Sequence, residues 1–364
     1  MEAGERTDRT AGERRGKPRL LEIEDLHVEF RTDEARVEAI DHVSLGLDKG
    51  ETLGIVGESG CGKSVTAFSV MGLLPDYAEV TGRVLFRGEE LLSKSEAELQ
   101  RIRGDRLSII FQEPLTSLNP VFTIEEQLAE VFRIHHRLYR GERVRQKVQE
   151  LLSRVGIPNP ERQMKSYPHQ LSGGLRQRAM IAMALACRPD VLIADEPTTA
   201  LDVTIQAQIL VLMKELQKEV GSGLIMITHD LGVIAQTADM VAVMYAGQVV
   251  EYTDVRSLFR NPRHPYTRGL LETVPRMTGE QDRLNEIKGM VPDMTSVPAG
   301  CRFADRCPLR FDRCDVPPEL MHVEEAHVRC RLYEGAAGPA ATGAATGTGE
   351  ATGTGAERKR EKGR

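Results

Sequence analysis

The chain contains 364 residues, of which 40% are hydrophobic, 28% charged and 4% aromatic, and its formal net charge is −6. This composition is typical of a globular protein in water, and the acidic balance argues against nucleic acid as a partner. Because no apolar run reaches the ~18 residues of a membrane-spanning helix and the charged N-terminus lacks the apolar core of a secretory signal, we expect a cytosolic chain that does not itself cross the bilayer.

The two ends of the chain predict disordered tails, since residues 1–19 are polar and charged and residues 334–364 are rich in Ala, Gly and Thr. Between them, apolar β-rich runs alternate with helical patterns, which predicts an α/β fold around a mostly parallel sheet. Prolines become frequent from about residue 262 to 300, which indicates a change into a small C-terminal region that carries cysteines.

The stretch GESGCGKS at residues 57–64 follows an apolar run and opens a helical pattern. Its glycines allow successive backbone N–H groups to point at phosphate oxygens, while Lys63 can reach the terminal phosphates and Ser64 can ligate Mg²⁺. The start of the helix adds its positive dipole end. A chance match in a Gly-rich turn is the alternative, but the context of strand, loop and helix predicts an ATP and Mg²⁺ site.

Three further apolar runs lead into polar side chains, because LSIIF precedes Gln112, VLIAD ends in Asp195 before Glu196, and LIMIT precedes His229. Ligands of open α/β sheets bind beyond the carboxyl ends of the strands, so we expect these residues to meet at one edge. Asp195 can then hold Mg²⁺ through water and Glu196 can polarise an attacking water. An ordinary helix-start turn and a structural histidine are the alternatives.

The stretch LSGGLRQRAMIAMALA places Ser172, Gly173 and Gly174 directly before a long helical pattern. Ser172 is predicted as the N-cap, and the exposed N–H groups at this helix start form a second anion site. One ATP hardly needs two helix N-termini from one chain. The segment is therefore either a simple capped helix or a site for a nucleotide that another chain binds.

Together these motifs resemble those of the nucleotide-binding subunits of ABC transporters, over about residues 20–260. In that family GESGCGKS is the Walker A loop, FQEPLTSLNP the Q-loop, LSGGLRQR the signature and VLIADEP the Walker B motif. TTALD matches the D-loop, which ends at Asp202, and THD supplies the switch histidine. The resemblance implies a P-loop ATPase cassette with an antiparallel β subdomain and a helical subdomain at about residues 113–185.

The resemblance also implies how the site works. Two ATPase subunits would face each other head to tail, with each signature covering the ATP that the other subunit holds, which explains the second helix N-terminus. Lys63, Glu196 and His229 are the implied catalytic residues, with Glu196 activating water and His229 holding the γ-phosphate. The implied magnesium ligands are Ser64, Gln112 and Asp195.

Phe30 falls where the family places an aromatic side chain that stacks on adenine; a plain core position in a strand is the alternative. The implied nucleotide-binding set is Phe30, Gly57, Glu58, Ser59, Gly60, Cys61, Gly62, Lys63, Ser64, Val65, Gln112, Ser172, Gly173, Gly174 and Asp202. Two positions depart from the usual pattern. Leu175 stands where the family commonly has Gln, and Cys61 is either a thiol of lowered pKa that is sensitive to oxidation or a small buried filler.

Four cysteines follow the spacing C-x5-C-x6-C-x15-C, at Cys301, Cys307, Cys314 and Cys330. Four thiols in one short cytosolic segment favour metal ligation. Zinc sites usually show closer pairs, whereas these wider loops could span a cubane. The resemblance favours a [4Fe–4S] cluster, with Zn²⁺ as the alternative. The lone Cys187 is expected in the core.

Three stretches resemble the oligopeptide and dipeptide importer ATPases in particular: LNP at 118–120, YPHQLSGG at 167–174 and HPYTRGLL at 264–271. The C-terminal region at residues 261–333 agrees with that group. The resemblance implies a subunit at the cytoplasmic face of the membrane that powers peptide import. Its partners would be a second ATPase subunit, identical or related, two membrane-spanning permease subunits and, indirectly, an extracytoplasmic solute-binding protein.

Other functions stay open at this point. The same ATPase role could serve nickel chelates, glutathione or another solute. A soluble ABC ATPase that acts on DNA or ribosomes is a rival, although only a modest segment separates Gln112 from Leu171. A second rival is an iron–sulfur redox sensor in which ATP is regulatory.

Overall fold

The computed structural model describes residues 19–32, 35–113, 117–135, 141–199, 201–273 and 287–334. The predicted disordered tails, apart from Arg19 and Glu334, lie outside the described residues. Within that part of the chain, no helix has the length and apolar character that a membrane span requires.

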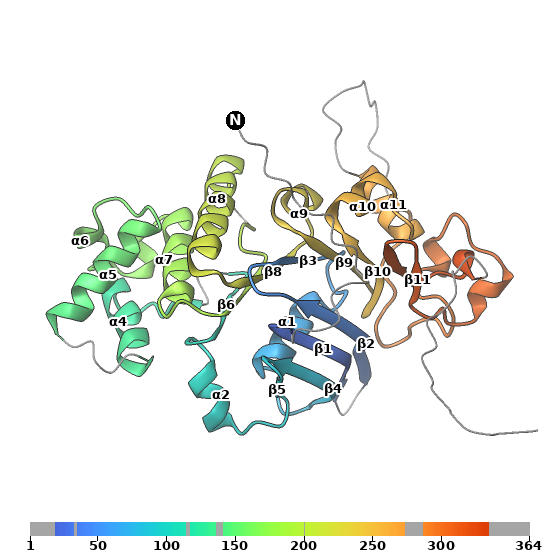
Figure 1. The fold of residues 1–364 in the computed structure, drawn as a ribbon, viewed down its shortest axis with the longest axis horizontal. Helices are drawn as coiled ribbons and strands as arrows, with labels where there is room; N and C mark the ends of the chain where they lie inside the picture. Colours follow the sequence, from blue (N-terminus) through green and yellow to red (C-terminus); the bar gives the residue numbers. More distant parts are fainter. Residues whose placement is uncertain are drawn as a thin grey trace, which may run out of the picture.

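An eight-stranded sheet runs through the described structure in the order β11-β12-β10-β9-β3-β8-β7-β6 (Figure 1). Five strands pair in parallel. They are β6 (Leu107–Ile110), β7 (Val191–Asp195), β8 (Gly223–Thr228), β3 (Thr52–Val56) and β9 (Met240–Tyr245). The other three pair antiparallel and are β10 (Gln248–Asp254), β12 (Ala326–Val328) and β11 (Met321–Val323). The predicted α/β fold with a mostly parallel sheet is confirmed.

A second, antiparallel sheet lies beside the first and has the strand order β2-β1-β4-β5. Its strands are β1 (Leu21–Arg31), β2 (Arg36–Leu47), β4 (Ala78–Phe86) and β5 (Glu89–Glu90). Buried and partly exposed residues alternate along the first half of β1, as expected for a sheet with one covered face. Every residue of β3, β7 and β8 is buried, which is typical of parallel strands covered on both faces.

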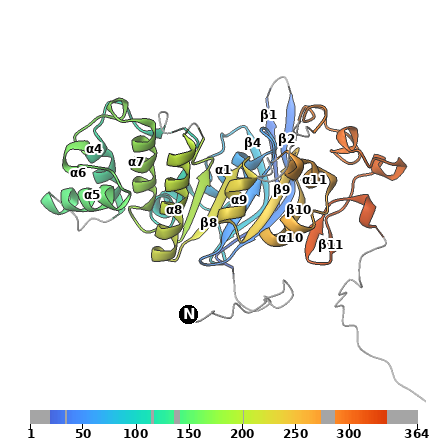
Figure 2. The ribbon, with the colours of Figure 1, turned by 90° about the horizontal axis from the view of Figure 1, so that it is seen from above.

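The helices fall into groups that Figures 1 and 2 separate clearly. At one end of the molecule lie α4 (Ile124–His135), α5 (Glu142–Arg154), α6 (Pro160–Gln163) and α7 (Gly173–Leu185). Along the sheets lie α1 (Lys63–Met71), α8 (Val203–Val220) and α9 (Leu231–Thr237), while α2 (Glu96–Ile102) lies at the lower edge of Figure 1, near β5. Helices α10 (Val255–Arg260) and α11 (Pro265–Glu272) lie toward the other end.

Two hydrophobic cores fill the space on either side of the parallel sheet. Alternate residues of β8 point into different cores, since Leu224 and Met226 pack with the helical end while Ile225 and Ile227 pack with the antiparallel sheet. Because side chains alternate between the two faces of a strand, β8 contributes to both hydrophobic cores. The loops at the carboxyl ends of these strands therefore start from a fixed framework.

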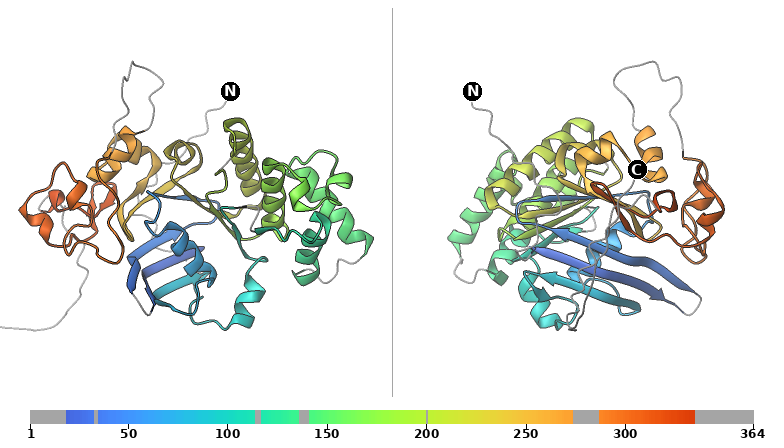
Figure 3. Two further views of the ribbon diagram at one scale, coloured as in Figure 1. Left: turned by 180° about the vertical axis from the view of Figure 1, so that it is seen from behind. Right: turned by 45° about the vertical axis from the view of Figure 1, so that its right-hand side comes forward.

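The C-terminal residues 287–334 are mostly irregular and lie beside β10 at the far end of the sheet (Figure 3). Their hairpin of β11 and β12 pairs with β10, where Glu251 lies opposite Val328. Phe303 is buried against the rings of Tyr245 and Tyr266 and belongs to the larger core. The cysteine-bearing region is thus fastened to the main sheet by backbone pairing and by packing.

Candidate functional site

The phosphate loop connects the buried strand β3 to α1. Gly62 is the N-cap of α1 and has a φ of 97°, a left-handed value that glycine tolerates best. At Gly57 a Cβ atom would lie 2.2 Å from the carbonyl oxygen of Met244, so that only glycine fits. The Lys63 ammonium donates hydrogen bonds to the carbonyl oxygens of Gly57 at 2.8 Å and Glu58 at 2.9 Å. The Lys63 side chain therefore folds back over the loop and ties its start to the first turn of α1.

The remaining loop positions differ in exposure. Ser59 and Gly60 are exposed, whereas Ser64 and Val65 are half-buried in the first turn of α1. Cys61 is fully buried, and burial raises the pKa of its thiol. Cys61 therefore acts as a buried filler, and the alternative of a thiol with lowered pKa is wrong, because desolvation outweighs the nearby lysine charge.

The carboxyl ends of the parallel strands meet at one edge, as predicted. In the register, Val56 lies beside Thr228, Asp195 beside Ile227 and Ile110 beside Ala194. The segments that follow these residues carry the phosphate loop, Glu196, His229 and Gln112.

Asp195 has the properties expected of a magnesium ligand. Its side chain is almost fully buried, and burial raises the pKa of its carboxyl, while a hydrogen bond with Ser64 acts in the opposite direction. Within the described residues, Asp195 Oδ1 is a buried oxygen without a hydrogen-bond partner. A carboxylate oxygen left unpaired beside a serine hydroxyl and the phosphate loop fits a hard divalent cation such as Mg²⁺.

Glu196 is the centre of the catalytic candidates. One carboxylate oxygen accepts hydrogen bonds from Gln112 Nε2 at 3.0 Å and Thr199 Oγ1 at 2.9 Å, and the other lies 3.2 Å from His229 Nδ1. Burial raises the pKa of Glu196, but the hydrogen bonds with Thr199 and His229 outweigh it and hold the pKa below its ordinary value. The lowered pKa favours the ionised carboxylate, and the φ of 45° at Glu196 shows local backbone strain at this position.

Hydrogen bonds join three of the four candidates at the strand ends, namely Gln112, Glu196 and His229. One further residue bonds to this group. Thr199 was missed from the sequence, although it stands three residues after Glu196 in the TTALD stretch. Gln112 contacts Glu196 rather than Asp195, so of the three predicted magnesium ligands the hydrogen bonds join only Ser64 and Asp195.

The signature segment lies elsewhere. Ser172 occupies the predicted N-cap of α7, but within the described residues its side chain makes no capping hydrogen bond. Ser172 and Gly173 are exposed, and a Cβ at Gly173 would meet no atom within 4 Å. Gly174 is half-buried, near Ile205. Figures 1 and 2 place α7 among α4, α5 and α8, apart from α1.

Two predicted nucleotide contacts have local roles of their own. Asp202 is the N-cap of α8 and accepts a hydrogen bond from the Ile205 amide at 3.0 Å. Phe30 is half-buried on β1, and its ring centroid lies 6.0 Å from that of Tyr77. Tyr77 is exposed and forms, with Phe30, an aromatic pair that was not predicted from the sequence.

The four cysteines of the predicted metal site all lie among the described residues. Among the described residues, no group of three or more His, Cys, Asp or Glu side chains is placed to hold a metal ion. Burial, and then the charges of the other three thiols, raise the pKa of Cys330 to about 11. The Cys301 amide also donates to the Cys314 carbonyl at 2.8 Å. Cys187 is half-buried rather than in the core, and burial raises the pKa of its thiol to about 12.

Two family descriptions match the sequence. Residues 40–199 match the family described as ABC transporter, and residues 250–314 match the one described as oligopeptide/dipeptide transporter, C-terminal region. The first range contains the phosphate loop, Asp195 and Glu196, and the second contains three of the four cysteines of the C-terminal cluster.

Individual proteins agree with these matches. The chain is 52% identical over 320 residues to the dipeptide transport ATP-binding protein DppD of Bacillus subtilis, covering 87% of this chain and 95% of that protein. It is 50% identical over 319 residues to the oligopeptide transport ATP-binding protein AppD of the same organism, with 86% and 97% covered.

The fold is similar to that of solved cassettes. The dimeric, post-hydrolysis structure of the ATP-binding cassette MJ0796 with ADP and Pi has a TM-score of 0.59 and 29% identity, over 65% of this chain and 99% of that chain. The resemblance inferred from the motifs is confirmed. The chain therefore belongs to the family of ABC transporter ATP-binding subunits, ATPases of the group that carries an oligopeptide/dipeptide transporter C-terminal region.

Proposed function

We propose that this chain hydrolyses ATP to power the import of dipeptides or oligopeptides by an ABC transporter. The observation that carries the ATPase role is the position of Glu196, held by Gln112, Thr199 and His229 at the edge where the phosphate loop begins. The peptide cargo is supported by relatives that are named as dipeptide and oligopeptide transport proteins.

The residues of the edge divide the chemistry among them. The loop amides of residues 57–64 and the Lys63 ammonium hold the phosphates, and Ser64 and Asp195 hold Mg²⁺. When bound, Mg²⁺ neutralises charge on the phosphate oxygens. Glu196 accepts the proton of the attacking water, and its lowered pKa leaves the carboxylate ionised at neutral pH. His229, within hydrogen-bond reach of Glu196, orients the γ-phosphate and the water.

A second subunit completes the site. Ser172, Gly173 and Gly174 of a facing ATPase chain would cover the γ-phosphate with an exposed helix N-terminus. Asp202 would lie near that interface, and Phe30 would stack on the adenine. Gln112, which bonds Glu196, would report the state of the site to the helices α4–α7.

The partners follow from this arrangement. We propose a cassette at residues 20–260, with a C-terminal region at 261–333, bound at the cytoplasmic face of the membrane to two permease subunits. The second ATPase subunit is a copy of this chain or a related one. A solute-binding protein on the other side of the membrane supplies the peptide.

The cysteine set is a separate proposal, namely a [4Fe–4S] cluster with Zn²⁺ as the alternative. It is supported by four cysteines in one short segment, of which Cys314 and Cys330 are buried. Iron, sulfide and zinc analysis of the full chain purified without oxygen tests it. Stoichiometric iron and sulfide that are lost in Cys301→Ser support the cluster, and metal-free wild-type protein would refute both forms.

Uptake of labelled peptide by the assembled transporter tests the main proposal. Lys63→Ala removes the phosphate-binding ammonium, and Ser172→Arg fills the exposed helix end, so each is expected to abolish uptake. The matched controls, Lys218→Ala and Ser153→Arg, change exposed residues of α8 and α5 and should transport normally. Normal uptake by the Lys63→Ala or Ser172→Arg transporter would contradict the proposal.

A further inference from the structure

Glu58 of the phosphate loop is held from three directions. Its carbonyl oxygen accepts a hydrogen bond from Lys63 Nζ at 2.9 Å, which is a contact within the loop. Its amide N–H donates to the hydroxyl oxygen of Tyr266 at 3.0 Å. Its carboxylate accepts two hydrogen bonds from the Arg306 guanidinium, at 2.5 and 3.0 Å. Two of these three anchors thus come from the C-terminal part of the chain.

The Arg306 side chain is itself firmly placed. It is only 6% exposed. Its guanidinium donates to the Tyr245 hydroxyl at 3.3 Å, to the Lys288 carbonyl at 3.1 Å and to the Ile287 carbonyl at 3.4 Å. The paired carboxylate of Glu58, which outweighs burial, raises the pKa of Arg306 further above its ordinary value. Because the planar Arg306 guanidinium is held by these contacts, it fixes the position of the Glu58 carboxylate.

The segment that carries Arg306 is fastened to the cassette. Tyr266 is fully buried, with its ring 4.7 Å from that of Tyr245 and 5.3 Å from that of Phe303. Arg302 donates to the Ala246 carbonyl at 2.6 Å and forms ion pairs with carboxylates of β2. Since these groups are packed and paired, the position of Arg306 relative to the loop is fixed by the fold.

We propose that Tyr266 and Arg306 are positioning residues for the ATP site. By fixing Glu58 they fix the carbonyl that anchors Lys63, so that the affinity of the cassette for ATP depends on its C-terminal region. The inference rests on the proposed function of the phosphate loop. It gives the C-terminal region a part in nucleotide binding that the loop motif alone does not contain.

Two physical effects act in the same direction. A loop that is already ordered loses less conformational entropy when it binds phosphate. In addition, Arg306 neutralises a half-buried carboxylate that would otherwise repel the phosphates. Loss of Arg306 is therefore expected to weaken ATP binding about tenfold, and loss of the Tyr266 hydroxyl, a single neutral hydrogen bond, about threefold.

Calorimetric titration of the full chain with Mg²⁺ and a non-hydrolysable ATP analogue measures these effects. We expect the Kd to rise about tenfold in Arg306→Ala, by an intermediate factor in Arg306→Lys and about threefold in Tyr266→Phe. The matched control is Arg310→Ala. Arg310 lies in the same segment but pairs with Asp305 and Asp315 at the surface, so its loss should leave the Kd unchanged.

A double-mutant cycle separates positioning from general destabilisation. In a Glu58→Gln background the repulsive carboxylate and the ion pair are already gone, so Arg306→Ala should add less than a twofold change in Kd. An undiminished effect of Arg306→Ala in that background, or wild-type affinity of folded Arg306→Ala, would overturn the inference. If Arg306→Ala does not fold, wild-type affinity in both Arg306→Lys and Tyr266→Phe overturns it.

The same titration distinguishes the two proposals. Lys63→Ala that binds the analogue like wild type would remove the proposed function together with the inference. Lys63→Ala that loses binding, while the Arg306 and Tyr266 variants keep it, would leave the proposed function intact and refute only the positioning role.

Discussion

The phosphate loop and the N-terminus of α7 are both helix starts with exposed glycine backbone, but their polar groups are satisfied differently. In the loop, Lys63 bonds two loop carbonyls, and Glu58 is held by residues of the C-terminal region. At α7, the exposed Ser172 makes no capping hydrogen bond within the described residues. Contacts within the chain thus shape the phosphate loop, but neither helix start has a side-chain cap, and the amide N–H groups of both stay available for a ligand.

Three other helices, α8, α9 and α10, begin with an aspartate side chain that caps the helix. Asp202, Asp230 and Asp254 each accept hydrogen bonds from the first-turn amides of their own helices. Ser172 begins a helix without such a bond, as do the glycine N-caps of α1 and α5, but its hydroxyl is a donor that those glycines lack. The comparison predicts that variants of the two helix starts will fail in different ways.

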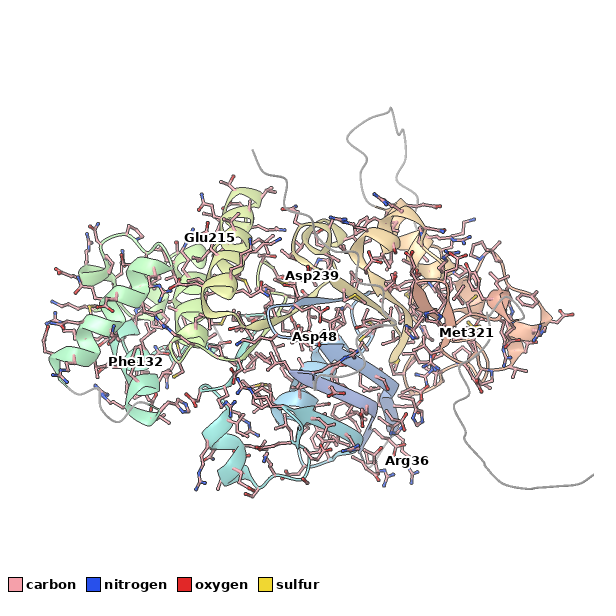
Figure 4. All side chains as sticks on the ribbon, viewed as in Figure 1. Arg36, Asp48, Phe132, Glu215, Asp239 and Met321 are labelled. Atoms are coloured by element: carbon pink, nitrogen blue, oxygen red, sulfur yellow. The ribbon has the colours of Figure 1, made fainter. Side chains whose placement is uncertain are left out.

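The largest effect is expected at Glu196, at the carboxyl edge of the parallel sheet. Glu196→Gln removes the ionised base, so ATP turnover should fall on the order of a thousandfold while ATP binding is retained. The matched control is Glu215→Gln on the exposed face of α8, which should keep wild-type turnover (Figure 4). Turnover of Glu196→Gln within a few-fold of wild type would show that Glu196 is not the base.

The pH dependence of stability checks the same residue. Since the folded-state pKa of Glu196 lies below 4.5, its ionised form contributes stability above pH 4.5, which is lost as the pH falls through the lowered value. Glu196→Gln lacks this contribution. The difference in free energy of unfolding between the two proteins should therefore be constant above pH 4.5 and shrink below it.

A smaller effect is expected at α7, and it should separate activity from stability. Ser172→Ala loses no capping bond, so its unfolding midpoint should match wild type, while turnover of the assembled transporter falls on the order of a hundredfold. Asp254→Ala is the converse control. It loses hydrogen bonds from the Arg256 and Ser257 amides, so it should cost about 1 kcal/mol of stability and keep wild-type turnover. Equal destabilisation by both changes would contradict the comparison.

The sequence predicted the edge of the sheet well because its signals are local. A glycine-rich loop between a buried strand and a helix, and polar residues after apolar runs, are fixed by backbone geometry and by parallel pairing. The positions of Asp195, Glu196, His229 and Gln112 followed from that rule. The hydrogen bond from Gln112 to Glu196 did not follow from it, because the direction of a side chain is set by tertiary packing.

The contacts between distant segments could not be predicted in this way. Tyr266 and Glu58 are separated by 208 positions, and Arg306 and Glu58 by 248. No periodicity or motif connects them. The pKa of Cys61 also depends on packing, since full burial raises a thiol pKa that a helix start alone would lower.

An effect of intermediate size is expected at Asp195, the proposed magnesium ligand at this edge of the sheet. Because burial raises its folded-state pKa, ionised Asp195 costs stability as the pH rises above the unfolded value of 3.8 and through the folded one. Asp195→Asn should therefore unfold at a higher temperature than wild type at neutral pH without nucleotide, but lose about tenfold in magnesium-dependent nucleotide affinity. A thermal shift assay with ATP, with and without Mg²⁺, measures both. A variant stabilised by Mg²⁺ and ATP as strongly as wild type would exclude Asp195 as a ligand.

The smallest effect is expected at Phe30, where the edge meets the antiparallel sheet. If Phe30 stacks on adenine, Phe30→Ala should raise the KM for ATP about fivefold, since an aromatic stack contributes about 1 kcal/mol, and leave kcat unchanged. Phe30→Tyr retains a ring and should behave as wild type. Tyr77→Ala tests whether the neighbouring ring, at a centroid distance of 6.0 Å, holds Phe30 in place. An unchanged KM for ATP in Phe30→Ala would assign Phe30 to the strand core, because only stacking on the base links this ring to nucleotide affinity.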